Sequence, residues 1–236
     1  MTEELFRADA YTASTTATVT AVTPDGIVLD RTVFYPMGGG QPGDTGTLTR
    51  AADGAVVAVA DTRYTDDGLV HVPDGDSGLA AGDGVTAAID WPRRHRLMRM
   101  HTLMHVLCGL VPGAVTGGQV GTDKSRLDFD LPEAVDKEAL NERLDTVIAE
   151  DRPVHVRWID RADLADRPEL VRTLSVQPPA DEGRVRLVEV EGIDHQSCGG
   201  THVASTGEIG AARVGKVEKK GQKNRRINLH LDDQGG

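Results

Sequence analysis

Residues 90–107 read DWPRRHRLMRMHTLMHVL, and this stretch marks a change of periodicity along the chain. Its apolar side chains recur at the spacing of one helix face: Leu97, Met100, Met104 and Leu107. Before it, short runs rich in Thr, Val and Ala alternate with Asp-Gly pairs, a strong signal for tight turns between antiparallel strands. We therefore expect an all-β domain before this helix and a domain of another class after it.

The second part of the chain combines both kinds of pattern. A second helix is expected around Leu140 to Ile148, and strands over 154–159 and 185–190. Residues 213–219 and 226–231 are expected to form a basic hairpin. The fold class is then α+β: a small antiparallel β-barrel over residues 1–90, followed over residues 91–236 by a two-layer α/β domain with a mostly antiparallel sheet.

Composition sets broad limits on the kind of protein. The chain has 236 residues, of which 27% are charged and 39% hydrophobic, so we expect a globular protein with a proper core. No apolar stretch is long enough to cross a membrane, and the first residues carry no secretory signal. We expect a cytoplasmic protein that associates with no membrane and needs no obligate protein partner.

Charge and cysteine content narrow the class of function. A formal net charge of -11 disfavours a protein that coats nucleic acid non-specifically, and 3% aromatic residues disfavour a surface that stacks bases. The two cysteines, Cys108 and Cys198, are too few for a disulfide framework. Cys108 continues an apolar run and is expected to be a small core residue, which leaves Cys198 as a candidate ligand.

Two histidines on the expected helix are the first sign of chemistry. His101 and His105 lie four positions apart, so their imidazoles project from one face a single turn apart and can bind one metal ion. Such a pair should arise by chance in about one chain in four. A zinc protease would carry Glu directly after the first histidine, whereas this chain has Thr102.

A second pair lies almost a hundred residues further on. Cys198 and His202 flank two glycines that let the backbone fold tightly, so the thiolate and the imidazole can converge without a helix. Both pairs together should occur by chance in only about one chain in fifty. With His101 and His105 they make a set of three nitrogens and one sulfur suited to tetrahedral zinc. His195, three residues before Cys198, could hydrogen-bond to one of the ligands and orient it.

A glycine-rich segment, GGGQPGDTG at residues 38–46, satisfies the glycine spacing of a dinucleotide-binding loop. We reject that function because Pro42 and the residues after it cannot open the helix that would hold a pyrophosphate. A long barrel loop is the simpler expectation. Gln41 is then the side chain equipped to contact a polar partner, since it carries both a donor and an acceptor.

Basic residues gather in the expected hairpin against the sign of the whole chain: Arg213, Lys216, Lys219, Lys220, Lys223, Arg225 and Arg226. A charged run is usually a solvated face, but this concentration is also typical of a patch that contacts phosphates. Four arginines ahead of the histidine pair could extend the patch toward the metal: Arg93, Arg94, Arg96 and Arg99.

Three separated motifs, in this order and spanning nearly the whole chain, resemble the AlaX-type proteins, free-standing relatives of the editing domain of alanyl-tRNA synthetase. The motifs are FYP at 34–36 leading into the glycine-rich segment, HTLMH at 101–105, and SCGGTHV at 197–203 leading into TGEIG at 206–210. The glycine-rich segment ahead of the histidines resembles the medium-length members, which keep an N-terminal barrel.

The resemblance implies a zinc-dependent deacylase that hydrolyses misacylated tRNA(Ala), chiefly Ser-tRNA(Ala) and also Gly-tRNA(Ala), as a free-standing editing factor that contacts the acceptor end. One zinc ion per chain would be held by His101, His105, Cys198 and His202. Gln41, with Gly39 and Gly40, would approach the substrate. Thr116 and Gln119 fall in a region where the family has pocket residues. Thr102 and Thr201 are hydroxyls beside ligands that could orient substrate or water. Phosphate contacts would fall to Lys219, Lys220, Lys223, Arg225 and Arg226.

Two alternatives stay open. The chain could be a tRNA-binding module whose zinc is purely structural, since four protein ligands are typical of such a site. It could also hydrolyse another acyl or peptide substrate. None of its motifs is a nucleotide site, so we expect neither ATP binding nor aminoacylation.

Overall fold

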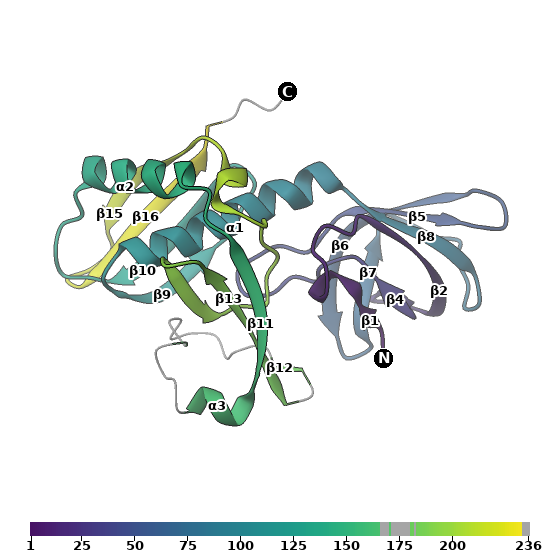
Figure 1. The fold of residues 1–236 in the computed structure, drawn as a ribbon. Helices are drawn as coiled ribbons and strands as arrows, with labels where there is room; N and C mark the ends of the chain where they lie inside the picture. Colours follow the sequence, from purple (N-terminus) through teal and green to yellow (C-terminus); the bar gives the residue numbers. More distant parts are fainter. Residues whose placement is uncertain (166–169, 171–179, 182, 233–236) are drawn as a thin grey trace. The chain divides into compact units, whose positions relative to one another are not determined.

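A computed structural model describes residues 1–165, 170, 180–181, 183–232 of the chain. These residues divide into two compact units, Met1–Arg96 and Leu97–Gly236. The observed class is the expected α+β: a closed antiparallel barrel in the first unit, and helices with antiparallel sheets in the second. Figure 1 labels most of their helices and strands. Among the described residues, no helix is long and apolar enough to cross a membrane.

The barrel closes in the strand order β2-β3-β7-β6-β5-β8. Its strands are β2 (Ser14–Thr23), β3 (Gly26–Leu29), β5 (Gly46–Arg50), β6 (Val56–Thr65), β7 (Gly68–Pro73) and β8 (Gly84–Ile89). Inward-facing residues alternate with exposed ones along β2 and β6, which is the period that a strand with one buried face requires. A short parallel pair, β1 (Glu3–Glu4) with β4 (Arg31–Thr32), and a 3-10 turn η1 (Leu5–Arg7) complete the unit.

The Asp-Gly pairs mark turns of the barrel, as the sequence predicted. Asp25-Gly26 joins β2 to β3, and Asp67-Gly68 joins β6 to β7. Gly26 has φ 145°, and a Cβ there would lie 2.6 Å from the carbonyl oxygen of His71. Only glycine fits that position, since other residues combine strain at this φ with a clash against β7.

The glycine-rich segment between β4 and β5 runs on into a strand, which agrees with the rejection of a nucleotide-binding loop. Asp44 holds this segment in place: its carboxylate accepts a hydrogen bond from the Tyr35 backbone N–H at 2.7 Å and forms an ion pair with Arg94. Both charged side chains are buried. A Cβ at Gly43 would lie 2.0 Å from the Thr62 carbonyl oxygen, so the loop passes directly against β6.

This ion pair corrects one expectation about the arginines. Arg94 was expected to extend a basic surface, but it is fully buried and also donates to the carbonyl oxygens of Ala10 and Val33. Arg99 donates to the Ile209 carbonyl oxygen. Both side chains are held by carbonyl or carboxylate acceptors from distant parts of the sequence, which the sequence pattern does not reveal. Because Arg94 is buried, it contributes no charge to a surface.

Helix α1 (Trp91–Leu110) contains the predicted apolar stripe and further buried apolar residues outside it. Met98, Leu103 and Val106 are buried as well as the residues of the stripe, so the helix is apolar on several sides. A helix with this pattern lies inside a protein, with no wide polar face toward water. His101, Thr102 and His105 are consequently all buried.

In the described part of the second unit, the strands form two antiparallel sheets. One has the order β15-β16-β10-β9, and the other is β11-β13-β12 with β14 paired to β13. Their strands are β9 (Ala114–Gln119), β10 (Lys124–Asp130), β11 (Val154–Asp160), β12 (Ala180–Asp181), β13 (Arg184–Val190), β14 (Asp194–Ser197), β15 (Ala212–Lys219) and β16 (Asn224–Leu231). The predicted basic hairpin is confirmed as β15 and β16, with a bulge between Val214 and Val217.

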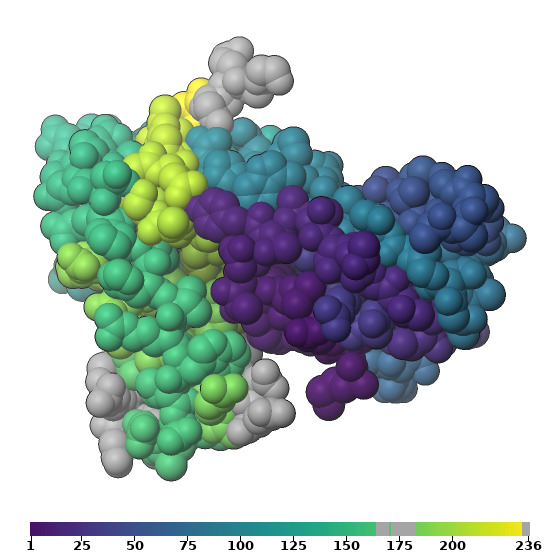
Figure 2. Space-filling model, turned by 45° about the vertical axis from the view of Figure 1, so that its right-hand side comes forward, coloured from purple at the N-terminus to yellow at the C-terminus, as the bar shows by residue number. Residues whose placement is uncertain are grey.

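Helical segments among the described residues of this unit include α2 (Lys137–Ala149), α3 (Arg161–Ala165) and the 3-10 turn η3 (Thr206–Ile209). Asp136 caps α2 by accepting a hydrogen bond from the Ala139 backbone N–H. Helix α2 packs on β15, and its apolar side chains Leu140 and Leu144 are buried. In the space-filling view the yellow-green stretch that contains η3 lies at the molecular surface (Figure 2).

Candidate metal centre

Two of the candidate ligands lie on α1, one turn apart. His101 and His105 are 6% and 4% exposed, and their ring centroids lie 5.4 Å apart. Because the helix is buried along this length, both imidazoles face the interior of the second unit. This is the arrangement that the four-residue spacing predicts.

The other two candidates lie on the loop between β14 and η3. This loop is held by Arg186 of β13, whose guanidinium donates to the carbonyl oxygens of Cys198 at 2.8 Å and Gly200 at 2.9 Å. The Cys198 backbone N–H donates in turn to the Arg186 carbonyl oxygen. Arg186 is buried, so these hydrogen bonds are shielded from water and fix the turn that brings Cys198 and His202 together.

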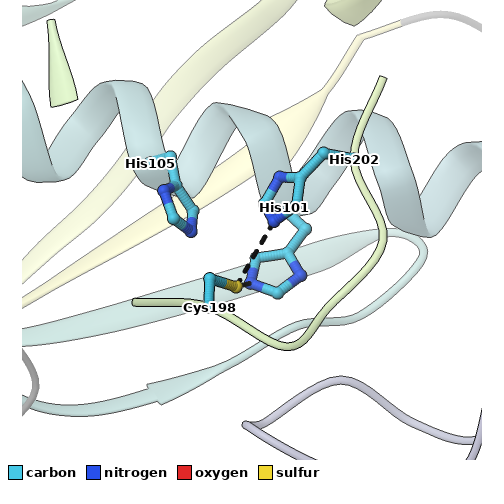
Figure 3. Close-up of side chains that lie close together, drawn as sticks. All are labelled: His101, His105, Cys198 and His202. Carbon is cyan, nitrogen blue, oxygen red and sulfur yellow. Dashed lines mark hydrogen bonds between the residues drawn. The ribbon is translucent and has the colours of Figure 1, made fainter. Parts of the chain in front are cut away.

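The four side chains converge in one place (Figure 3). Their possible ligand atoms all lie within 4.8 Å of one another. Cys198 Sγ is 3.6 Å from His101 Nε2 and 3.4 Å from His202 Nε2. A tetrahedral zinc ion with ordinary Zn–S and Zn–N bonds separates sulfur from nitrogen by about 3.6 Å. The donor set and its spacing therefore fit zinc.

The surroundings of Cys198 and His202 favour the protonation states that a metal requires of these two side chains. Burial alone would raise the pKa of the Cys198 thiol, but His101, His202 and His105 outweigh it and hold that pKa well below its usual range. Burial and the neighbouring His101 lower the pKa of His202 well below its ordinary value. A thiolate beside a neutral imidazole is the form of this pair that binds zinc, and metal binding then competes with protons.

His105 differs from the other ligands because a carboxylate lies behind it. Its Nδ1 donates to Asp194 Oδ2 at 2.8 Å. Burial would lower the pKa of His105, but Cys198 and Asp194 raise it to about 10. Asp194 also accepts a hydrogen bond from Gln196 Nε2 at 2.8 Å. Neither residue was predicted from the sequence, which indicated His195 as the supporting residue. Asp194, not His195, contacts His105, because alternate residues of β14 face α1.

Thr102 also supports a ligand. Its hydroxyl lies 3.1 Å from His202 Nδ1 and accepts a hydrogen bond from the Val203 backbone N–H at 3.2 Å. Thr102 is fully buried, so its contacts couple α1 to the loop that carries His202. Thr201 is also buried. The catalytic roles of the two threonines stay predictions.

The remaining predicted contact residues lie in other parts of the fold. Thr116 and Gln119 are on β9, where Thr116 donates to the Asp128 carbonyl oxygen and Gln119 accepts from Arg126. Gly39, Gly40 and Gln41 belong to the N-terminal unit, in a turn closed by two backbone hydrogen bonds between Gly38 and Gln41. Gln41 is buried. Their contact with substrate stays a prediction.

The basic hairpin contains two kinds of cation. Lys219, Lys220 and Lys223 are exposed. Arg225 is buried and donates to the Glu133 and Pro132 carbonyl oxygens, and Arg226 forms a bidentate ion pair with Asp128. The two arginines therefore bind the protein itself, and the expected phosphate contacts depend on the three lysines.

Cys108 and His71 lie outside the converging group of side chains. Cys108 is a buried core residue, as expected. His71 is a satisfied core histidine that contacts Thr32 and the Ile27 carbonyl oxygen. In the described part of the chain, His101, His105, Cys198 and His202 form the one group of three or more His, Cys, Asp or Glu side chains whose ligand atoms converge.

Two known families match segments of this chain, and one of the segments contains two of the candidate ligands. Residues 185–228 match the family described as the threonyl and alanyl tRNA synthetase second additional domain, and residues 5–93 match the class II (A) tRNA synthetases. The first match includes Cys198 and His202. The chain thus has the class of domain found in proteins that handle aminoacyl-tRNA.

Full-length relatives identify the family within that class. The chain is 42% identical to the alanyl-tRNA editing protein AlaX-M of Methanosarcina barkeri, over 99% of this chain and 100% of the relative. It is 32% identical to AlaX-M of Saccharolobus solfataricus over 96% of this chain and 98% of the relative. A match to alanine–tRNA ligase of Sulfurisphaera tokodaii, at 35% identity, covers 92% of this chain but 25% of the ligase. The chain belongs to the AlaX-M family of alanyl-tRNA editing proteins.

Proposed function

We propose that this protein hydrolyses the ester bond of misacylated tRNA(Ala), releasing serine and, as a second substrate, glycine. The observation that carries the proposal is the convergence of His101, His105, Cys198 and His202 in a buried site of the second unit. The full-length relatives named alanyl-tRNA editing proteins supply the substrate class. The reaction is that of a free-standing deacylase in the cytoplasm that recognises the acceptor end of the tRNA.

The four converging side chains are the proposed ligands of one zinc ion per chain. When bound, zinc supplies Lewis acidity toward an ester carbonyl or a water molecule. The protein's own contribution is to hold the ligands: His105 donates to Asp194, Thr102 contacts His202, and Arg186 donates to the loop that carries Cys198. Because the site is buried, these hydrogen bonds act in a low dielectric and keep the geometry rigid.

A second candidate function is a tRNA-binding module whose zinc is purely structural. The four protein ligands favour it, since catalytic zinc sites ordinarily keep one position open. A deacylase with this ligand set needs a fifth position or a ligand that yields. We propose no aminoacylation for either candidate, because the glycine-rich segment leads into a strand and forms no nucleotide-binding helix terminus.

The first experiment is hydrolysis of Ser-tRNA(Ala), with Ala-tRNA(Ala) as the control, before and after zinc is stripped and restored. We expect release of serine that is lost with the metal and regained on its return, with alanine spared. Release of neither amino acid by folded, zinc-loaded protein would reject the deacylase. Activity that follows the tRNA body when acceptor stems are exchanged would reject recognition through the acceptor end.

The Cys198→Ala variant separates the two candidates. A deacylase should lose turnover by at least tenfold while the variant keeps its fold, whereas loss of a purely structural zinc should unfold the second unit. Cys108→Ala is the matched control, because Cys108 is also a buried thiol of this unit but belongs to the apolar core. It should leave zinc content and turnover near those of the wild type.

A further inference from the structure

Asp194 lies beside the candidate metal centre without belonging to the converging group. Its Oδ2 atom accepts a hydrogen bond from His105 Nδ1 at 2.8 Å, and a second from Gln196 Nε2 at 2.8 Å. Asp194, His105 and Gln196 are each only 4% exposed. A carboxylate in this position is shielded from water, so its attraction for the imidazole N–H is strong.

This contact decides which ring nitrogen of His105 can bind a metal. An ionised carboxylate only accepts hydrogen bonds, and its 2.8 Å contact with Nδ1 is much shorter than the 3.4 Å contact of Gln196 Nε2 with the same atom, so the proton lies on Nδ1 of His105. In the form of the ring that binds a metal, this proton stays on Nδ1 and the lone pair is on Nε2. A ring that carried its proton on Nε2 would offer no ligand atom to the converging group.

The backbone around Asp194 fixes this geometry from two directions. In the antiparallel pairing of β13 and β14, Asp194 lies opposite Val190 and Gln196 lies opposite Val188, so the two side chains share one face of β14. At Gly109, four residues after His105, a Cβ would lie 2.2 Å from the Ile193 carbonyl oxygen. Helix α1 and the turn before β14 therefore touch backbone to backbone, directly beside Asp194.

We propose that Asp194 is the positioning residue of the metal centre: it holds His105 in the Nδ1–H form and presents Nε2 to zinc. Gln196 keeps the carboxylate in place by donating to the same oxygen atom. This inference rests on the proposed zinc site but not on the identity of the substrate. Carboxylates that orient a ligating histidine in this way ordinarily change metal affinity by about 10–100-fold when they are removed.

The test compares the zinc affinity of Asp194→Asn with that of the wild type, by competition with a chelator on the full chain. We expect zinc to bind about 10–100-fold more weakly, because the neutral amide attracts the Nδ1 proton less and can also donate to Nδ1. Glu191→Gln is the matched control. Glu191 is a neighbouring carboxylate that also approaches a histidine, with 3.4 Å between its Oε2 and His155 Nε2. Both side chains of this pair are exposed. Removing the Glu191 carboxylate should therefore change zinc affinity by less than about twofold.

A second measurement needs no variant, so it decides the inference even if Asp194→Asn fails to fold. Long-range nitrogen–proton NMR spectra of the zinc-loaded wild type should show His105 with its proton on Nδ1. A proton on Nε2, or equal zinc affinity in folded Asp194→Asn and wild type, would overturn the role of Asp194 alone. A wild type that binds no zinc would overturn the proposed metal site as well, and zinc binding without serine release would reject only the deacylase.

Discussion

His71 is held in the barrel in its neutral form. The side chain is fully buried, its Nδ1 donates to the Ile27 carbonyl oxygen at 3.0 Å, and its Nε2 accepts from the Thr32 hydroxyl at 2.7 Å. The Phe34 ring lies edge-on against it at 5.1 Å. Burial outweighs the hydrogen bond to Ile27 and lowers the pKa of His71 from 6.5 to about 4.

This pKa predicts a pH-dependent stability of the barrel. Between pH 6.5 and about 4 the unfolded chain binds a proton at His71 that the folded chain does not, so stability falls as the pH is lowered through this window. The loss from this residue should reach about 3 kcal/mol. In His71→Gln, which keeps a donor and an acceptor but does not titrate, urea unfolding should show a correspondingly smaller loss between pH 7 and pH 4.5. Parallel curves for the two proteins would contradict the assignment.

The ligands of the candidate site could be predicted because their spacing is local. His101 and His105 are separated by one helical turn, and Cys198 and His202 by a short glycine turn. Asp194 carries no such signal, since its partner His105 lies 89 residues away. The one hint is a carboxylate on the strand that leads into Cys198. The role of Arg186 could not be predicted either, because only the fold brings its guanidinium to the carbonyl oxygens of Cys198 and Gly200.

At the scale of elements, the contact between α1 and the turn before β14 depends on Gly109. An ideal Cβ there would lie 2.2 Å from the oxygen and 2.8 Å from the carbonyl carbon of Ile193, which are backbone atoms that cannot rotate away. Gly109→Ala should therefore destabilise the protein by about 1–3 kcal/mol, although alanine is intrinsically the better helix former. It should also weaken zinc binding, because β14 carries Asp194. Urea unfolding and chelator competition measure the two effects.

Gly84→Ala is the control for this prediction. The nearest atom to a Cβ at Gly84 is the Ala51 Cβ, at an ordinary 3.7 Å, so the substitution should be close to neutral. Equal stabilities of Gly109→Ala and the wild type would show that α1 and the turn can separate without cost. The contact would then not position Asp194.

The same distinction between local and long-range signals explains how far the fold could be predicted. Asp-Gly turns and alternating strands predicted the barrel, and the helical period predicted α1 and α2. These predictions were possible because each pattern involves only a few neighbouring residues. The parallel pairing of β1 with β4 could not be found in this way. Neither could the buried ion pair of Asp44 with Arg94, which joins residues 50 positions apart.

For the molecule as a whole, charge limits how it can contact tRNA. The net charge is -11, and the hairpin arginines Arg225 and Arg226 are occupied by contacts within the protein. Of the predicted phosphate contacts, Lys219, Lys220 and Lys223 are then the exposed ones, and Lys216 of the same hairpin is exposed as well. The ion pair of Lys220 with Glu218 is at the surface and competes only weakly.

Substituting all three lysines by glutamine should therefore weaken tRNA binding and reduce its salt dependence. Each lost phosphate contact lowers the slope of log affinity against log salt by about 0.9, so the slope should fall by about 3. Binding titrations at several salt concentrations measure this slope. The matched control is Lys137→Gln/Arg157→Gln/Arg161→Gln, which removes three exposed cations outside the hairpin and gives the same net charge, -11 - 3 = -14. If both triple variants lowered the slope equally, the effect would come from total charge, and the hairpin would have no special contact with the tRNA backbone.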